Sequence, residues 1–379
     1  MLLATQTVSI GDFAPLFGLF DHESEKACVL RDKAGSPILL LFYAHDDNVE
    51  CQEIACTFRD LMPTFDNLGV QVYSISLDSP EARKKFAEEH NIPFKLLSDK
   101  DYSTSLNYGV CKQEKRENES FFTYSRTVFL LDANLRVMQI YPLANFSLAM
   151  NMILHDVQTR LPQPAPQYIK NQAPVLLIPN VLDPYFCRQL IKIWETQGNE
   201  ESGSMRRVGD KTVGFIDYNH KRRRDHWIQD EKLLSYLDRV MRRRVFPEIH
   251  KAFNFEASRR EAYKIACYDS TTGGYFRRHR DNTTGGTAHR RFAMTLNLNV
   301  EEYEGGYLRF PEYGPHLYKP ETGSVVIFGC SVMHEATDVT AGRRFALLCF
   351  FYGEEDARQR QEYENRVEND YNSIIRLTN

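Results

Sequence analysis

The sequence lacks any long apolar run. Its longest apolar stretches, residues 37–44 and 345–352, are about eight residues each. A helix that spans a membrane needs ~20 consecutive apolar residues, so we expect no transmembrane segment. The first residues, MLLATQTVSIGDF, also lack the basic start and long apolar stretch of a secretory signal. Together these absences predict a cytoplasmic protein that is not embedded in a membrane.

The sequence also lacks an excess of charge of either sign. Its 47 basic and 51 acidic residues give a net charge of −4, which argues against bulk attraction to nucleic acid or to an anionic membrane. No internal repeat is visible, which argues against a repeat array. The eight cysteines are scattered through a long chain without a signal. That distribution favours reduced, catalytic or metal-binding cysteines over a disulfide scaffold.

What is present is enough material for more than one folded domain. With 379 residues, of which 42% are apolar, a prior of ~150 residues per domain predicts two or three domains. Residues 161–174 read LPQPAPQYIKNQAP, and four prolines in this stretch indicate a stiff connector. We therefore predict a domain at 1–162, a linker at 163–174 and a second domain at 175–379.

The two predicted domains differ in fold class. The first alternates strand-like and helix-like segments, which predicts an α/β domain. Its expected elements are strands at 37–43 and 70–76, helices at 49–65 and 79–90, and a hairpin at 127–132 and 136–141. The second begins with a strand at 175–178 and helices at 183–195 and 230–244. From about residue 261 it turns to short strands separated by Gly, Pro and Asn, which is typical of a sandwich or jelly roll. The tail, 353–379, reads as a surface helix.

Three residues of the second domain form a candidate metal site. His279 and Asp281 stand two positions apart, and in a strand such residues point to the same face. His334 follows a later strand and offers a third ligand. Two histidines and one carboxylate are the facial triad of non-haem Fe(II) oxygenases, whereas structural zinc prefers four closed ligands.

An arginine follows this set. Arg344 lies ten residues after His334 in the strand-like segment RRFALLCFF. A buried guanidinium needs an anionic partner, and a carboxylate held by two hydrogen bonds meets that need. Arg343 competes for the role. The two side chains alternate in a strand, so one of them points inward, and the Gly342-x-Arg344 spacing favours Arg344.

The stretch 263–352 resembles the Fe(II)- and 2-oxoglutarate-dependent oxygenases, especially the prolyl 4-hydroxylase-like group. The matching segments are CYDSTTGGYFRRHRDN, GGYLRFP, His334-Glu335 and GRRFA. The resemblance implies a double-stranded β-helix (a jelly roll) with supporting N-terminal helices, in which His279, Asp281 and His334 bind iron and Arg344 and Tyr268 bind 2-oxoglutarate. It further implies oxidative decarboxylation of 2-oxoglutarate with O2, hydroxylation of a protein or peptide (a prolyl residue is one candidate), and ascorbate as a reductant.

Two positions depart from that family. Some relatives carry a second cosubstrate tyrosine in the strand after the His-x-Asp pair, where this chain has Asn297. The nucleic-acid repair branch carries a second arginine six residues after the first, where this chain has Phe350. The second departure counts against a nucleic-acid substrate.

The first domain carries a candidate redox site. Cys51 follows a buried strand at the start of a predicted helix, and helix N-termini and nearby cations lower the pKa of a thiol. Cys56 lies five residues further on and could resolve an oxidised Cys51 if the helix end unwinds. Arg126 precedes a strand and could stabilise the thiolate.

Residues 7–160 resemble the AhpC/TSA peroxiredoxins, most closely the bacterioferritin-comigratory (PrxQ-like) kind. The matching segments are GDFAP, Phe42-Tyr43, the Cys51/Cys56 pair, SISLDSPE, LLSDKDYSTSLNYGV and the Arg126 segment. The resemblance implies a thioredoxin-like fold with a peroxidatic Cys51, a resolving Cys56 and pairing into a homodimer. Ala44 and Asn48 stand where the family signature has Pro and Thr.

The sequence is also compatible with two other functions. The chain could be chiefly a thiol peroxidase with an auxiliary C-terminal domain, or a binding protein without catalysis. The basic run 221–224 (KRRR) favours a solvated surface, with binding of an acidic peptide or nucleic acid as the alternative, and nearby acids such as Asp225 dilute its charge.

Overall fold

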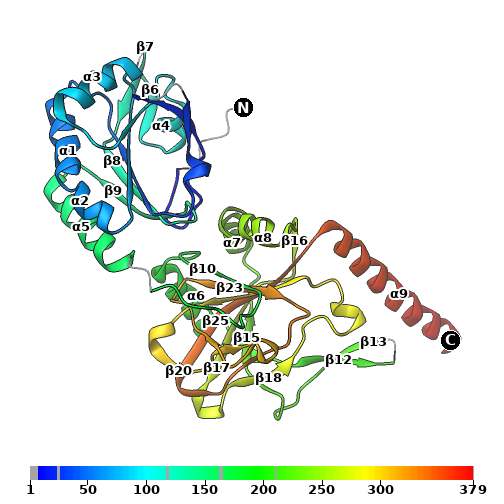
Figure 1. The fold of residues 1–379 in the computed structure, drawn as a ribbon. Coiled ribbons are helices and arrows are strands. Elements are labelled where there is room, and N and C mark those ends of the chain that lie inside the picture. Colours follow the sequence, from blue (N-terminus) through cyan, green and yellow to red (C-terminus); the bar gives the residue numbers. More distant parts are fainter. Residues whose placement is uncertain (1–6, 24–25, 117–118, 162–164, 210, 379) are drawn as a thin grey trace. The chain divides into compact units, whose positions relative to one another are not determined.

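The computed structural model describes residues 7–378 apart from 24–25, 117–118, 162–164 and 210. The chain divides into two compact units, 1–166 and 167–379, which Figure 1 colours from blue through cyan to green and from green to red, respectively. The division falls inside the predicted linker, of which residues 163 and 164 lie outside the described part. None of the helices in the described part of the chain has the length and apolarity needed to cross a membrane.

The first unit is built on one seven-stranded sheet in the order β2-β1-β5-β4-β3-β8-β9. Its strands are β1 (Gly18–Asp21), β2 (Ala27–Val29), β3 (Ile38–Phe42), β4 (Gln71–Ser76), β5 (Lys95–Ser98), β8 (Thr127–Leu131) and β9 (Val137–Pro142); β6 (Cys111–Arg116) and β7 (Glu119–Tyr124) pair as a separate hairpin. Its helices are η1 (Leu30–Lys33), α1 (Val49–Asp60), α2 (Met62–Asn67), α3 (Pro80–His90), α4 (Ser103–Asn107) and α5 (Phe146–Arg160). Strand β3 runs parallel to β4 and antiparallel to β8.

The central strand β3 is buried on both faces. Leu39 and Leu41 belong to a core shared with α1, α2, α3 and α5, whereas Leu40 and Phe42 belong to a second core on the other face. A strand covered on both sides is expected to be continuously apolar, which explains the run at this position. Helix α1 starts at Asn48, whose side-chain oxygen accepts hydrogen bonds from the backbone N–H groups of Glu50 and Cys51.

Most elements predicted for this unit are confirmed. The strands at 37–43 and 70–76, the helix at 79–90 and the hairpin are present within one or two residues. The predicted helix 49–65 is wrong in one respect, because it breaks at Leu61 into α1 and α2. Pro63 is the second residue of α2, and a proline cannot donate the backbone hydrogen bond that continuation of the first helix would require. Strand β5 and helix α5 were missed, because β5 spans four residues and α5 has a weak apolar period.

The second unit is a sandwich of two sheets. The larger has the order β10-β23-β19-β25-β17-β15-β11, with β16 and β20 also paired to β25, and the smaller has the order β14-β18-β24-β21-β22. The larger sheet comprises β10 (Val175–Ile178), β11 (Glu200–Glu201), β15 (Arg224–Trp227), β16 (Arg259–Arg260), β17 (Lys264–Asp269), β19 (Phe292–Asn297), β20 (Tyr303–Gly305), β23 (Val325–Gly329) and β25 (Val339–Tyr352). The smaller comprises β14 (Lys221–Arg222), β18 (Tyr275–His279), β21 (Leu308–Arg309), β22 (Leu317–Tyr318) and β24 (His334–Ala336); β12 (Ser204–Val208) and β13 (Lys211–Phe215) form a hairpin.

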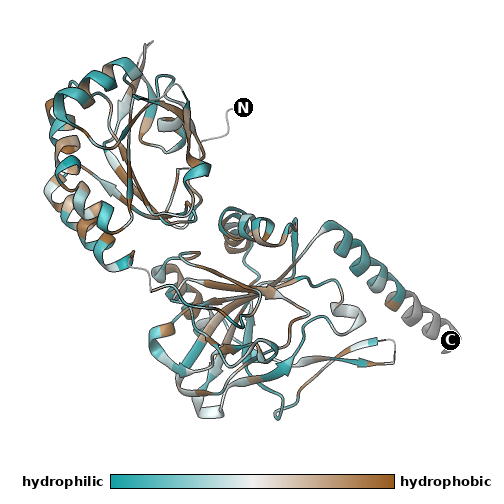
Figure 2. Ribbon diagram, in the orientation of Figure 1, coloured by the Kyte–Doolittle hydropathy of each residue, from teal (hydrophilic) through white to brown (hydrophobic). Residues whose placement is uncertain are grey.

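Helices cover the outer face of the larger sheet. They are α6 (Pro184–Thr196), α7 (Glu231–Arg244) and α8 (Phe246–Phe253), and their apolar residues share one core with alternate residues of β19 and β25. Apolar residues accordingly concentrate on the central strands in Figure 2. The tail is α9 (Glu354–Thr378), and the short 3₁₀ turns are η2 (Ser270–Thr272), η3 (Gly285–Thr287), η4 (Val300–Glu302) and η5 (Pro311–Tyr313).

Strand β25 divides its side chains between two environments. Phe345 and Leu347 point into the core beneath the helices. Arg344 and Phe350 lie on the opposite face and line a cavity between the two sheets. The two-residue period of the strand therefore places the functional side chains opposite the core.

At Gly342, two residues before Arg344, strand β25 passes close to the backbone of Glu302. It has a φ of +70°, and a Cβ at this position would collide with the carbonyl oxygen of Glu302. Gly209 has a similar φ of +61° but open space around it. We expect Gly209→Ala to cost only the strain of the left-handed backbone, about 1–2 kcal/mol. Gly342→Ala should cost more, roughly 3 kcal/mol or above, because overpacking adds to that strain.

Calorimetric unfolding of the two full-length variants measures this difference. Equal loss of stability in both variants would show that the contact with Glu302 does not constrain the strand.

Candidate functional site

The predicted metal ligands come together on the smaller sheet. Strands β18 and β24 are neighbours, and His279 is directly opposite His334 in their register. Asp281 follows β18, and its two carboxylate oxygens lie 3.5 Å from His279 Nε2 and 3.3 Å from His334 Nε2. One ligand atom from each of the three residues lies within 4.8 Å of the others.

Contacts behind the triad orient both imidazoles. His279 Nδ1 lies 2.7 Å from the carbonyl oxygen of Arg277, and His334 Nδ1 lies 3.0 Å from that of Val332. These carbonyls accept the Nδ1 protons and leave each Nε2 free to bind a cation, as is usual for metal-bound histidines. Burial opposes ionisation of Asp281, but the two histidines hold its pKa well below its ordinary value. The donor set therefore fits a divalent cation that keeps open positions.

The triad opens into a cavity of about 900 Å³ between the two sheets. Arg344 reaches into this cavity with only 2% of its surface exposed, and its guanidinium lies 5.0 Å from the centre of the Tyr268 ring. Its Nε atom is buried with no hydrogen-bond partner among the described residues. Arg343 points the other way and forms a half-exposed ion pair with Glu195 at 2.8 Å. A buried guanidinium with an unused donor is what a bound carboxylate would satisfy.

A tyrosine that was missed in the sequence lies beside the Arg344 guanidinium. Tyr303 on β20 is 4% exposed, and burial raises the pKa of its phenol while the adjacent Arg344 acts to lower it. Asn297 stands at the position where some relatives carry a second cosubstrate tyrosine. Its side chain donates a hydrogen bond to the carbonyl oxygen of Pro320 at 2.8 Å. The residues of β19 that line the cavity are instead Ala293, Met294 and Thr295. Only the tertiary pairing of β20 with β25 brings Tyr303 to Arg344.

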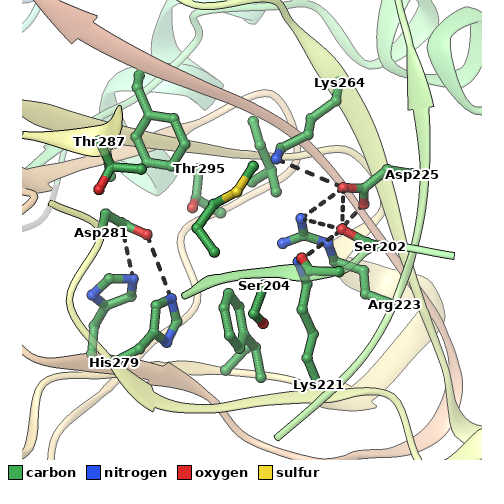
Figure 3. A pocket seen from close by; sticks show the side chains of 18 of the residues that line it. Ser202, Ser204, Lys221, Arg223, Asp225, Lys264, His279, Asp281, Thr287 and Thr295 are labelled. Atoms are coloured by element: carbon green, nitrogen blue, oxygen red, sulfur yellow. Dashed lines mark hydrogen bonds and ion pairs between the residues drawn. The ribbon is translucent and has the colours of Figure 1, made fainter. Parts of the chain in front are cut away.

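The interpretation of the basic run 221–224 as a solvated surface is correct for two of its residues and wrong for the other two. Lys221 and Arg223 are 6% and 8% exposed, whereas Arg222 and Arg224 are exposed. The alternation of an extended chain explains the division. Figure 3 shows Lys221 and Arg223 beside Asp225 and Lys264, across the cavity from His279 and Asp281. The sequence signal was the i, i+2 spacing of Lys221 and Arg223 in an extended segment.

The candidate redox cysteine of the first unit, Cys51, lies in an environment that disfavours the reactive thiolate. Cys51 lies in the first turn of α1 and is 3% exposed. Burial raises the pKa of its thiol, and Arg126 only partly opposes this effect. The Arg126 guanidinium forms an ion pair with Glu50. The expectation that the helix N-terminus lowers the pKa of Cys51 is therefore wrong for this conformation.

Cys56 lies further along the same helix, and its Sγ is 3.8 Å from His90 Nδ1. All eight cysteines are free thiols. Five residues of helix rise by ~7.5 Å, which exceeds the usual Cα separation in a disulfide. A bond between Cys51 and Cys56 would therefore require α1 to unwind locally.

Known protein families match the two units of the chain separately. The AhpC/TSA family model matches residues 10–140, and the 2OG-Fe(II) oxygenase superfamily model matches residues 263–352. The Bcp protein of Coxiella burnetii is 36% identical over 136 residues, which are 36% of this chain and 89% of that protein. Peroxiredoxin Bcp of Escherichia coli K12 is 34% identical over 131 residues, 35% of this chain and 83% of that protein.

Among solved structures, peroxiredoxin Q of Xanthomonas campestris matches with 21% identity and a TM-score of 0.37, covering 42% of this chain and all of that one. The first unit has the thioredoxin-like fold of peroxiredoxins, and the second is a sheet-rich oxygenase domain. The chain therefore belongs to the AhpC/TSA peroxiredoxin family through its N-terminal domain, fused to a domain of the 2OG-Fe(II) oxygenase superfamily.

Proposed function

We propose that the C-terminal domain is a hydroxylase in which His279, Asp281 and His334 bind Fe(II) and Arg344 binds 2-oxoglutarate. The observation that carries this proposal is that a facial set of ligands and a buried guanidinium with an unused donor line one cavity. When bound, iron and 2-oxoglutarate supply the activation of O2 and the oxidising power for C–H hydroxylation.

The protein's own part is positioning. Arg344 holds the distal carboxylate of 2-oxoglutarate, with Tyr268 and Tyr303 beside the guanidinium. The backbone carbonyls of Arg277 and Val332 fix the two imidazoles so that their Nε2 atoms face Asp281. Apolar side chains that line the cavity near the metal ligands, such as Phe276 and Phe328, limit the access of water to the reacting groups, which reduces side reactions.

We propose a protein or peptide as the substrate, with a prolyl side chain as the first candidate. The cavity continues to the β12–β13 hairpin, where Met205 and Ile216 line it and are more than half exposed. Exposed apolar side chains beside a deep cavity suit an extended chain that inserts one residue. Ascorbate would serve as an external reductant that keeps the iron ferrous.

A second activity is favoured by Cys51 at the N-terminus of α1, within reach of Arg126. We propose that Cys51 reduces peroxide and that Cys56 resolves the oxidised cysteine after α1 unwinds. The two-electron cycle requires a thiol reductant, which the cytoplasm supplies. Pairing of this domain into a homodimer is part of the same proposal.

The matched arginines test the cosubstrate site. Arg344→Gln removes the buried guanidinium, and we expect the KM for 2-oxoglutarate to rise by roughly 100-fold, as for the loss of a charged double hydrogen bond. Arg343→Gln alters the neighbouring exposed arginine and should leave KM within about twofold. The measurement is succinate formation by the full chain with Fe(II) and ascorbate. A larger effect from Arg343→Gln would contradict the assignment.

The metal site is tested by iron binding without turnover. His279→Ala should weaken Fe(II) binding by more than ~100-fold, because two remaining ligands hold the ion poorly. His316→Ala is the control, because His316 is exposed and contributes no ligand to the cluster. Anaerobic titration of the full-length variants gives the affinities. Iron retained by His279→Ala at the wild-type level would place the metal elsewhere.

The peroxidase is tested by peroxide consumption with a thiol reductant. Cys51→Ser should reduce it to background, and His279→Ala should leave it unchanged. Because burial raises the pKa of Cys51 above its ordinary value, the reactive thiolate is a minor species at neutral pH. The rate should then rise by close to tenfold per pH unit between about pH 7 and 8. A rate that stays flat over this range would show that the reacting thiol has a lowered pKa.

A further inference from the structure

The wall of the cavity opposite the metal ligands carries an excess of buried positive charge. We call it the cationic wall and define it by Lys221, Arg223 and Lys264 together with the single carboxylate of Asp225. Asp225 is 2% exposed at its side chain, Arg223 is 4% exposed and Lys264 is 15% exposed. Figure 3 shows these side chains converging on one side of the cavity, with His279 and Asp281 on the other.

The carboxylate of Asp225 is already committed to Arg223. Both of its oxygens accept hydrogen bonds from that guanidinium at 2.7 Å, and Ser202 adds a third at 2.6 Å. Lys264 Nζ lies 3.7 Å from the same carboxylate, too far for a hydrogen bond. One negative charge therefore faces three positive ones.

Lys264 has no hydrogen-bond acceptor among the described residues. Its ammonium lies 4.9 Å from the centre of the Trp227 ring and 5.9 Å from that of Phe350. Burial and the nearby Arg223 lower its pKa despite the attraction of Asp225. A buried ammonium with unused donors is costly unless an anion accompanies it.

Lys221 connects this wall to the metal ligands. Its ammonium donates to Ser202 Oγ at 2.7 Å and to the carbonyl of Gly203 at 2.6 Å, which leaves one of its three donors unused. It also lies 4.7 Å from the centre of the Phe276 ring, and that ring stacks on His279 at 3.5 Å between centres. A ligand held at this wall would therefore lie one aromatic ring away from the metal site.

Acidic residues at the rim do not neutralise the wall. Glu200 and Glu201 also line the cavity but are exposed. Their carboxylates accept hydrogen bonds from the Trp227 indole and the Tyr218 hydroxyl, respectively. Asp281, the remaining acid of the cavity lining, pairs with the two histidines.

We propose that the cationic wall binds a carboxylate of the molecule to be hydroxylated, through Lys264 and the unused donor of Lys221, while Arg344 holds 2-oxoglutarate. This inference rests on the proposed hydroxylase function and narrows its substrate to an anionic one. The two carboxylate sites are separated by Tyr268, whose hydroxyl accepts from Arg223 at 3.2 Å and whose ring lies against Arg344. The carboxylate can come from an acidic side chain of a peptide or from the C-terminus of a chain.

Binding without turnover tests this inference independently of catalysis. The full chain is held with Fe(II) and saturating 2-oxoglutarate in the absence of O2, and ligands are titrated by calorimetry. The first pair of probes is acetyl-glycyl-prolyl-glutamate amide and its glutamine counterpart, which tests a side-chain carboxylate. The second pair is acetyl-glycyl-proline and its amide, which tests a terminal carboxylate.

We expect the carboxylate member of at least one pair to bind the wild type about tenfold or more tightly than its neutral partner, as for one charged hydrogen bond. Lys264→Gln should reduce this preference to within about twofold, and Lys264→Arg should retain most of it. Lys232→Gln changes an exposed lysine on α7 and should have no effect. The KM for 2-oxoglutarate should stay within about twofold in Lys264→Gln.

Three results would overturn the inference. These are equal binding of both members in both pairs, an unchanged preference in Lys264→Gln, and a KM for 2-oxoglutarate that rises in Lys264→Gln as it does in Arg344→Gln. The last would assign the wall to the cosubstrate. Failure of the proposed function is distinct, because it appears as the absence of succinate formation in the wild type.

If Lys264→Gln folds poorly, Lys264→Met provides a second variant for the test. Asp225 keeps its two hydrogen bonds from Arg223 in this variant, so replacing the Lys264 ammonium, which forms no hydrogen bond, by an apolar side chain should maintain stability. The preferred carboxylate should then raise the thermal midpoint of the wild type but not that of the variant. Equal shifts in the two proteins would count against the proposal.

Discussion

The two-residue alternation of strand β25 is the constraint on which the oxygenase domain depends. Phe345 and Leu347 pack beneath the helices, whereas Arg344, Leu348 and Phe350 line the cavity. The strand pairs with β17 and β19 along most of its length, so a slip by one residue would exchange core and cavity residues together. Burial of the apolar face therefore fixes the direction of Arg344 without any local interaction of the arginine itself.

The same constraint explains which parts of the site are readable in the sequence. His279 and Asp281 stand two positions apart, so alternation predicted that they share a face. His334 and Arg344 lie on other strands, and the chemistry of a facial triad together with the family resemblance grouped them with this pair. The choice between Arg343 and Arg344 is of the same kind, and the structure places Arg344 inside. The limits of β3, β4 and α3 were equally accessible, because continuous apolar runs and a Ser-Pro helix start are local signals.

Residues whose role comes from pairing between distant strands could not be found in this way. Tyr303 reaches Arg344 because β20 pairs with β25, and no spacing along the chain indicates this. The role of Lys264 depends on the pairing of β15 with β17, which brings Asp225 and Trp227 beside it. The prediction for the basic run 221–224 failed for another reason. Its composition suggested solvent exposure, whereas the alternation of an extended chain buries every second residue of the run.

The two domains differ in how far their folds prepare the chemistry. In the oxygenase domain the ligand atoms lie within 4.8 Å of one another and hydrogen bonds orient the histidines. Little ordering entropy then remains to be lost when a metal binds. In the peroxiredoxin domain Cys51 is buried, its pKa is raised, and Arg126 is shared with Glu50.

Cys51 and Cys56 also belong to one continuous helix. Disulfide formation between Cys51 and Cys56 therefore depends on a local opening of α1, and its rate includes the population of that opened state. The stability of the first turn of α1, which the cap by Asn48 supports with two hydrogen bonds, accordingly acts against this step. A weaker cap would raise the opened population and with it the rate at which Cys56 resolves an oxidised Cys51.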